Sequence, residues 1–223
     1  MAIQTEPFET VGPAGRIDCL VDWPDPDQPL LGWALVLHPH PLHGGTRNNK
    51  VVTTLSRAYA QAGYAVLRPD FRGIGKSEGS FDQARGETAD MQQLVQAFLT
   101  EHPQLDGKPW LLAGFSFGTS VAAQLYSVLR EEQTQPLPHL LTLVGTAVKR
   151  FAWREVVLPA NTVVIHGERD EVVPLQEVFD WIVSYRIAVT VIPGATHFFH
   201  GYLIELKKLA LDALQQMSAE TAV

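Results

Sequence analysis

Two kinds of apolar pattern alternate along this chain from residue 31 onward. Short apolar runs bounded by glycine or proline predict buried strands, and longer segments with apolar residues every three or four positions predict helices. The runs cover residues 31–37, 64–67, 110–113, 140–144, 162–165 and 187–192. The helical segments cover residues 48–62, 91–99, 119–130, 175–183 and 203–217.

Residues 5–11 and 16–23 carry Val, Ile and Phe between glycine and proline, which predicts an antiparallel pair of edge strands. Strand and helix then alternate to the end of the chain, a pattern typical of a mostly parallel sheet covered by helices on both faces. In the helix at 175–183 the expected core face is a set of five apolar side chains: Leu175, Val178, Phe179, Ile182 and Val183. No repeat, low-complexity tract or linker divides the sequence, so we expect one α/β domain over residues 1–223.

Composition excludes several classes of protein. A formal charge of −7 disfavours binding to nucleic acid or anionic lipid, because either partner requires a basic face. The single cysteine, Cys19, has no partner for an internal disulfide, which favours a reducing compartment. No basic residue precedes Arg16, and the longest apolar run, Leu30 to Leu37, is far shorter than a membrane helix. We expect a cytoplasmic protein without a membrane partner.

The segment Gly114-Phe115-Ser116-Phe117-Gly118 has the G-x-S-x-G pattern and lies between a predicted strand and a predicted helix. In that position the pattern predicts a sharp turn that exposes one side chain at the edge of the sheet. Flanking glycines remove the Cβ atoms that would collide in such a turn. Ser116 is therefore the candidate nucleophile, and the helix that follows offers free N–H groups to a developing oxyanion.

A serine nucleophile needs a base and an acid that orients the base, in the chain order serine, acid, histidine. Both partners are expected in loops that follow strands, since ligands lie beyond the carboxyl ends of parallel strands. Asp170 and His197 meet this requirement and are our candidates. The alternatives left open are Glu168 and Glu171 for the acid and His200 for the base; His166 is interpreted as a core residue or one that supports the site.

The oxyanion hole is expected to use the Phe117 N–H and one donor from the loop after residue 37. Pro39 and Pro41 have no N–H, so the donor is His40 or, as the alternative, Leu42. A metal site on the histidines of this loop is disfavoured because their spacing is irregular and no acidic or thiol ligand is near in the sequence. The glycines at 73 and 75 lack the full dinucleotide-binding pattern, and we expect no cofactor.

Five motifs together resemble the α/β-hydrolase superfamily, and within it a group of small bacterial hydrolases with a minimal cap. They are the His-Pro-rich segment running into Gly-Gly and Asn-Lys (38–50), Phe-Arg-Gly-x-Gly-x-Ser (71–77), Ala-Gly-Phe-Ser-Phe-Gly (113–118), Gly-x-x-Asp-x-Val-Val (167–173) and His-Phe-Phe-His (197–200). The resemblance implies an α/β-hydrolase fold, with an eight-stranded sheet that has one antiparallel strand. It also implies a triad of Ser116, Asp170 and His197, but it does not supply a substrate.

The leading hypothesis is a serine hydrolase that cleaves small acyl esters or thioesters through an acyl-enzyme. A peptidase or acyltransferase using the same three residues is the alternative enzyme, and a binding module without catalysis is the alternative class. The connection Gly145 to Ala160 is too short for a deep acyl tunnel, so we expect an open site with at most a shallow apolar rim. Candidate rim residues are Phe115, Phe117, Phe198 and Phe199. The expected partner is a small-molecule acyl substrate, and a homo-oligomer is left open.

Overall fold

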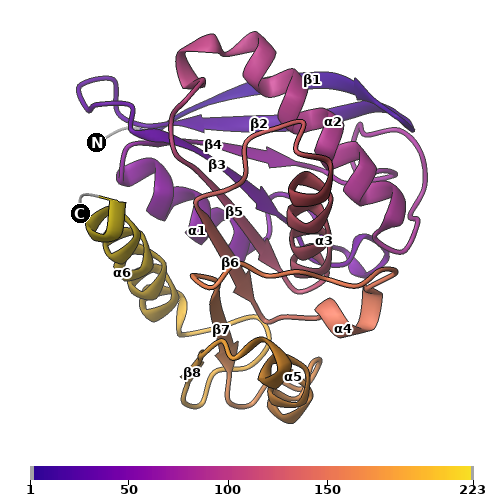
Figure 1. The fold of residues 1–223 in the computed structure, drawn as a ribbon, viewed down its shortest axis with the longest axis vertical. Helices are drawn as coiled ribbons and strands as arrows, with labels where there is room; N and C mark the ends of the chain where they lie inside the picture. Colours follow the sequence, from indigo (N-terminus) through magenta and orange to yellow (C-terminus); the bar gives the residue numbers. More distant parts are fainter. Residues whose placement is uncertain (1–2, 222–223) are drawn as a thin grey trace.

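A computed structural model describes residues 3–221, which form an eight-stranded sheet with helices on both faces (Figure 1). The strands are β1 (Gln4–Gly12), β2 (Gly15–Trp23), β3 (Gly32–Leu37), β4 (Tyr64–Pro69), β5 (Trp110–Phe115), β6 (Leu140–Val144), β7 (Val163–Gly167) and β8 (Val189–Ile192). The α-helices are α1 (Lys50–Gln61), α2 (Arg85–Glu101), α3 (Phe117–Glu132), α4 (Val148–Phe151), α5 (Leu175–Ile182) and α6 (Leu203–Thr221). Short 3₁₀ turns are η1 (Pro41–His43), η2 (Pro103–Leu105) and η3 (Val183–Tyr185).

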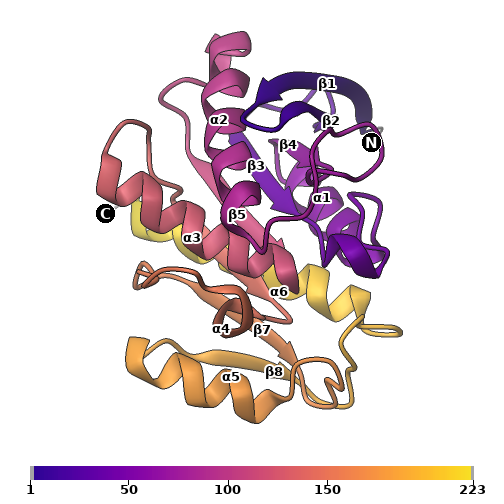
Figure 2. The ribbon, with the colours of Figure 1, turned by 90° about the vertical axis from the view of Figure 1, so that its right-hand side faces the viewer.

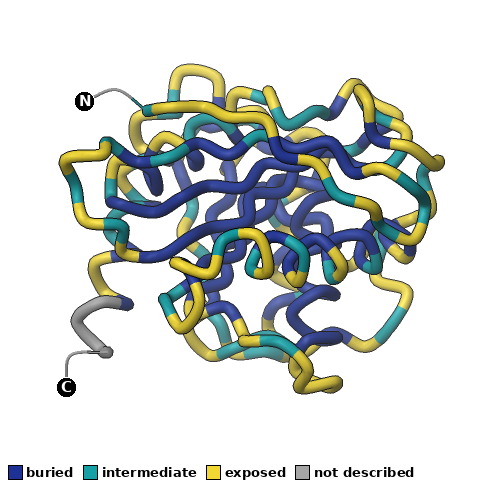
Figure 3. Tube along the Cα trace, turned by 90° about the horizontal axis from the view of Figure 1, so that it is seen from above, coloured by how far each residue is buried: buried dark blue, intermediate teal, exposed yellow. Residues whose placement is uncertain are grey.

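The strand order is β1-β2-β4-β3-β5-β6-β7-β8, and β2 runs in the direction opposite to the other seven strands. This confirms the mostly parallel eight-stranded sheet with one antiparallel strand. The crossovers bring α1 and α6 to one face of the sheet, and α2, α3 and α5 to the other (Figures 1 and 2). Because helices cover both faces, every residue of β3, β4, β5 and β6 is buried, as the near-continuous apolar runs predict (Figure 3).

The apolar face predicted for residues 175–183 is wrong in part. Val178 and Ile182 are buried in the core, whereas Phe179 is 40% exposed and Val183 is 70% exposed. The α-helix ends at Ile182, and the chain turns into η3 at Val183, so the helical spacing does not continue to that residue. The strand at this edge of the sheet, β8, has four residues and leaves little surface for α5 to cover.

The carboxyl ends of the parallel strands gather the loops that carry the candidate site residues. Residues 38–49 follow β3, residues 70–84 follow β4, Ser116 follows β5, and the loops after β7 and β8 carry Asp170 and His197. No helix in the described part of the chain is long and apolar enough to cross a membrane.

Candidate active site

Ser116 occupies the turn between β5 and α3 in a strained conformation, with φ of 53° and ψ of −120°. A positive φ is costly for a residue with a side chain, so close packing must hold it. Gly118 allows that packing, because a Cβ there would lie 2.5 Å from the Leu37 carbonyl oxygen. The Ser116 N–H donates to the Val144 carbonyl at 2.9 Å and ties the turn to β6. The predicted strand–turn–helix is therefore present, with Ser116 at its tip.

His197 links Ser116 to Asp170 through two hydrogen bonds. Its Nε2 lies 2.9 Å from Ser116 Oγ, and its Nδ1 lies 2.7 Å from Asp170 Oδ2. Because an ionised carboxylate can only accept, Nδ1 carries the proton and Nε2 accepts from the serine hydroxyl. The structure thus brings together three residues from three separate loops, the nearest pair being 27 positions apart in the sequence.

The Asp170 carboxylate is held from two sides. Oδ1 accepts the Val172 and Val173 N–H groups at 2.9 and 2.7 Å, and Oδ2 faces His197. Burial acts to raise the pKa of Asp170, but the hydrogen bond and charge of His197 outweigh it, so the pKa lies below its usual value. Asp170 therefore stays ionised and can orient the imidazole.

The alternative acids and base take other positions. Glu168 Oε2 accepts the Gly194 N–H at 2.7 Å, and Glu171 Oε2 lies 3.5 Å from the His197 backbone nitrogen. His200 is exposed, and its ring stacks on Phe198 with 6.0 Å between centroids. His166 is fully buried beside Asp170, as a supporting role requires.

The histidines of the loop after β3 point in different directions. His38 is buried; its Nε2 accepts the Phe71 N–H at 2.9 Å and its Nδ1 donates to the Pro39 carbonyl at 2.7 Å. The His40 and His43 rings stack 4.4 Å apart, and His40 Nδ1 accepts the Leu42 N–H at 3.2 Å. Within residues 3–221, no cluster of three or more His, Cys, Asp or Glu side chains has the arrangement of a metal site.

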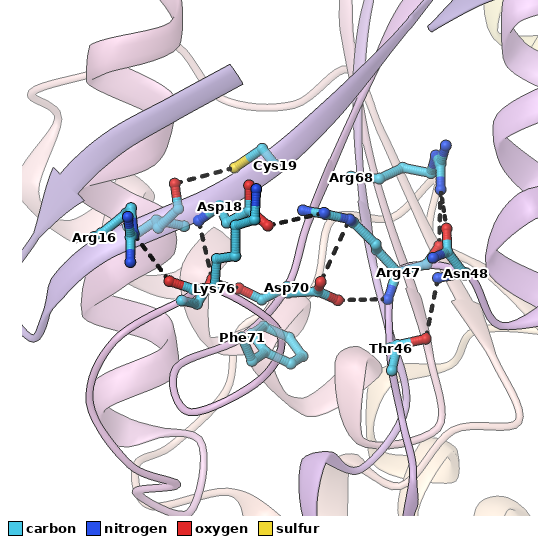
Figure 4. A network of polar contacts seen from close by, with 12 residues as sticks. Arg16, Asp18, Cys19, Thr46, Arg47, Asn48, Arg68, Asp70, Phe71 and Lys76 are labelled. Carbon is cyan, nitrogen blue, oxygen red and sulfur yellow. Dashed lines mark hydrogen bonds and ion pairs between the residues drawn. The ribbon is translucent and has the colours of Figure 1, made fainter. Parts of the chain in front are cut away.

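A buried ionic network that was not predicted from the sequence holds residues 46–49 against the sheet (Figure 4). Asp70 Oδ1 accepts the Arg47 N–H at 2.8 Å, and the Arg47 guanidinium lies 2.8 Å from Asp18 Oδ2 and 3.3 Å from Asp70 Oδ2. Arg68 Nη1 donates to the Arg47 carbonyl at 2.9 Å, while its Nε donates to Asp22 Oδ2 at 2.7 Å. The loop that carries His40 is thereby anchored to both β2 and β4.

A cavity of about 250 Å³ opens beside Ser116. Its polar lining comes from His40, His43, Asn49 and Arg150, and its apolar lining from Phe117, Ala147, Phe151, Val172, Val173 and Phe198. Of the predicted apolar rim, Phe117 and Phe198 line the cavity, whereas Phe115 and Phe199 are fully buried in the core. Phe151 and Val172, which were not among the predicted rim residues, line the cavity as well.

Residues 145–160, here called the crossing segment, form one wall of the cavity through Ala147, Arg150 and Phe151. Phe151 packs edge-on against Phe117 with 5.0 Å between ring centroids. Buried polar side chains of α3 form a row of hydrogen bonds with the backbone of the crossing segment, here called the ladder. The hydrogen-bonded pairs are Ser120 with Ala147, Gln124 with Phe151 and Trp153, and Ser127 with Val157, at 2.9–3.3 Å.

Comparisons with known proteins find a matching family model and similar chains over almost the whole length. The family model described as serine aminopeptidase S33 matches residues 40–151. An uncharacterized protein of Rickettsia prowazekii, RP471, is 33% identical over 211 residues, which cover 91% of this chain and 86% of RP471. The crystal structure of XC6422 from Xanthomonas campestris, described as an α/β serine hydrolase without lid, is 32% identical, with a TM-score of 0.84 and coverage of 97% and 96% of the two chains. An α/β serine hydrolase homologue from Coxiella burnetii is 34% identical, with a TM-score of 0.78 and coverage of 96% and 99%.

Proposed function

The chain belongs to the family of α/β serine hydrolases described as serine aminopeptidase S33, and on that basis we propose that it cleaves small acyl esters or thioesters through an acyl-enzyme. The observation that carries the proposal is the unbroken line of contacts from Ser116 Oγ through His197 to Asp170 Oδ2, at the edge of an open cavity.

In the proposed reaction, Ser116 Oγ attacks the acyl carbonyl while His197 Nε2 takes its proton. The tetrahedral intermediate collapses, and the alcohol or thiol leaves with that proton. A water molecule then attacks the acyl-enzyme, gives its proton to His197, and releases the acid with Ser116 restored. Asp170 remains ionised throughout and stabilises the imidazolium that forms in each half of the cycle.

The oxyanion is proposed to receive the N–H groups of Phe117 and His40. The Leu42 N–H already donates to His40 Nδ1, which leaves it unavailable to substrate. Within the described residues, neither the Phe117 nor the His40 N–H has a protein acceptor. Free donors at this edge of the cavity suit an oxygen whose charge develops in the transition state.

The cavity lining favours an ester over the amino terminus of a peptide. Among the described residues that line the cavity there is no Asp or Glu, and the Arg150 guanidinium is paired with Glu177. A substrate with a free ammonium group would lack a carboxylate partner in this lining. The lidless wall and the volume of about 250 Å³ suit a short acyl group.

The experiment that tests this function is labelling with a fluorophosphonate, followed by turnover of a panel of acyl esters, thioesters and aminoacyl amides. We expect the wild-type chain to be labelled and to hydrolyse short esters, and Ser116→Ala to lose both properties while its circular dichroism spectrum is unchanged. Loss of a nucleophile typically costs several orders of magnitude in kcat. Retention of more than a few per cent of turnover in folded Ser116→Ala would contradict the assignment.

A further inference from the structure

His166, the next-to-last residue of strand β7, is buried against Asp170 and does not line the cavity. Its Nε2 lies 2.8 Å from the Val173 carbonyl oxygen and 3.2 Å from Asp170 Oδ2. Its Nδ1 is buried and has no hydrogen-bond partner among the described residues. The proposed reaction leaves this histidine without a role, although it stands next to the acid.

The surroundings of the ring determine where its proton lies. Nε2 faces two acceptors, the Val173 carbonyl and the Asp170 carboxylate, so Nε2 carries the hydrogen and Nδ1 is an unprotonated acceptor. Burial lowers the pKa of His166, which keeps the ring neutral. His166 therefore directs one N–H at the turn formed by residues 170–173.

The unpaired Nδ1 shows that packing alone does not account for a histidine here. Burying a polar atom without a partner is unfavourable, and a leucine would fill a similar volume without that atom. The free-energy cost of burying Nδ1 is offset only if the Nε2–H makes an interaction that an apolar side chain cannot make.

The hydrogen bonds around Asp170 show what the Nε2–H does. The His166 N–H holds the Val173 carbonyl, and the Val173 N–H binds Asp170 Oδ1 together with the Val172 N–H. The turn that cradles Oδ1 is thus tied at its far end to a strand residue. With Oδ1 fixed in this way, Oδ2 faces His197 Nδ1 at 2.7 Å.

We propose that His166 is a positioning residue for Asp170: its Nε2–H fixes the turn 170–173 so that Asp170 Oδ2 stays directed at His197. This rests on the proposed function, because positioning matters only if His197 acts as the base. Without the Nε2–H, the Val173 carbonyl is free, the turn gains alternative conformations, and the carboxylate spends time turned away from the imidazole.

Three variants separate this role from general stability. His166→Leu removes the N–H, and His166→Gln replaces it with an amide N–H. Val164→Ala is the matched control, because Val164 is buried two residues earlier on β7, on the same face of the sheet and away from Asp170. The other groups that act electrostatically on His166 or Asp170, namely His197, Glu177 and Arg150, are retained in all three variants.

The measurements are kcat and KM for a short ester, and an NMR titration of the His197 imidazole. We expect His166→Leu to lower kcat about 10- to 100-fold with KM within a factor of about two, since small displacements of a reacting group have effects of this size. We also expect its His197 to gain a second proton at lower pH than in wild type, because the imidazolium loses its carboxylate for part of the time. His166→Gln should recover most of kcat, and Val164→Ala should change neither measurement.

A His166→Leu variant with wild-type kcat and a wild-type His197 titration would overturn the proposal. So would a His197 titration that moves to higher pH, because it would mean that the carboxylate stays in place and the ring acts only through its dipole. The NMR titration requires no turnover. If folded Ser116→Ala keeps its activity, the proposed function fails, while the titration still decides whether His166 positions Asp170.

Discussion

Two of the buried histidines that stand beside aspartates, His38 and His197, differ in what their ring nitrogens can do. His38 follows β3, is fully buried, and has its Nε2 3.9 Å from Asp70 Oδ1. His197 follows β8, is 2% exposed, and has its Nδ1 2.7 Å from Asp170 Oδ2. Each ring also packs against a phenylalanine, at 4.4 Å in the first case and 5.1 Å in the second.

The difference lies in the atoms that satisfy the ring nitrogens. Backbone groups of Phe71 and Pro39 satisfy both nitrogens of His38, whereas Asp70 pairs with Arg47. A backbone N–H gives up no proton, so His38 holds two loops together and transfers nothing. His197 instead joins the Ser116 hydroxyl, whose proton Nε2 is placed to accept, to the Asp170 carboxylate, which stays ionised and orients the ring. We therefore expect a buried histidine near an aspartate to act as a base only where its second nitrogen meets a side chain that can give up a proton.

The largest expected difference between the two histidines is in turnover. His197→Gln should lower kcat about a thousandfold or more, since no base remains to accept the Ser116 proton. His38→Gln should leave kcat per folded molecule within about tenfold of wild type, because His38 only supports the loop. Steady-state kinetics measures both, with the folded fraction of each variant taken from circular dichroism. Comparable losses of kcat in the two variants would contradict the distinction between His197 as the base and His38 as a support for the loop.

The second expected difference is in stability. His38→Leu leaves the Phe71 N–H and the Pro39 carbonyl without partners, at about 1–3 kcal/mol for each group. We therefore expect the free energy of unfolding to fall by about 2–6 kcal/mol in urea denaturation. The exposed His200→Leu is the control and should lie within about 0.5 kcal/mol of wild type. A His38→Leu protein as stable as wild type would show that the backbone groups find other partners.

The third difference appears when pH is lowered. Burial lowers the pKa of His38 from 6.5 to about 3. Above pH 6.5 the ring is neutral in both the folded and unfolded states, so it has no effect. Between pH 6.5 and 3 the unfolded chain binds a proton that the folded chain does not, and stability falls as pH falls. The slope is about 1.4 kcal/mol per pH unit, or about 2 kcal/mol between pH 6.5 and 5.

Urea denaturation of wild type and His38→Leu at a series of pH values isolates this contribution. The wild-type free energy of unfolding should fall more steeply with decreasing pH, so that the two curves converge. Parallel curves over this pH range would mean that His38 binds a proton as easily in the folded state as in the unfolded one.

The smallest expected effect is that of acyl chain length on kcat/KM, which depends on how far the cavity beside His197 encloses the substrate. An enclosing pocket would gain about 0.8 kcal/mol for each methylene buried, whereas this cavity is open and bounded by the crossing segment. For p-nitrophenyl esters of increasing chain length, kcat/KM should be flat or falling beyond about six carbons. A steady rise out to twelve or sixteen carbons would reveal an acyl pocket, and the case for a short acyl substrate would fail.

Local patterns sufficed to predict the elements that bring the candidate residues together. The strand, turn and helix around Ser116 are specified within a dozen residues, and the positions of Asp170 and His197 follow from the strands before them. Their convergence needs only the rule that parallel strands end at the same edge of the sheet.

The parts that could not be predicted depend on contacts between distant residues or on the rotation of one side chain. Arg47 meets Asp18 and Asp70 across more than 20 positions in each direction, and no local pattern pairs these charges. Only the ring orientation of His40 shows that the Leu42 N–H is engaged, so the sequence left both donors open. Ser120, Gln124 and Ser127 of α3 are buried against the crossing segment, a contact between distant residues that no local pattern predicts.

The ladder between α3 and the crossing segment also bears on how substrate enters and product leaves. In enzymes with a hinged cover, each turnover includes an opening step, and that step often sets the rate. Here the wall beside Ser116 is fastened along its length to a buried helix. Under the proposed function, small esters reach the serine by diffusion without waiting for a segment to move. We therefore expect the rate to rise smoothly with ester concentration, with no jump where the ester begins to form micelles.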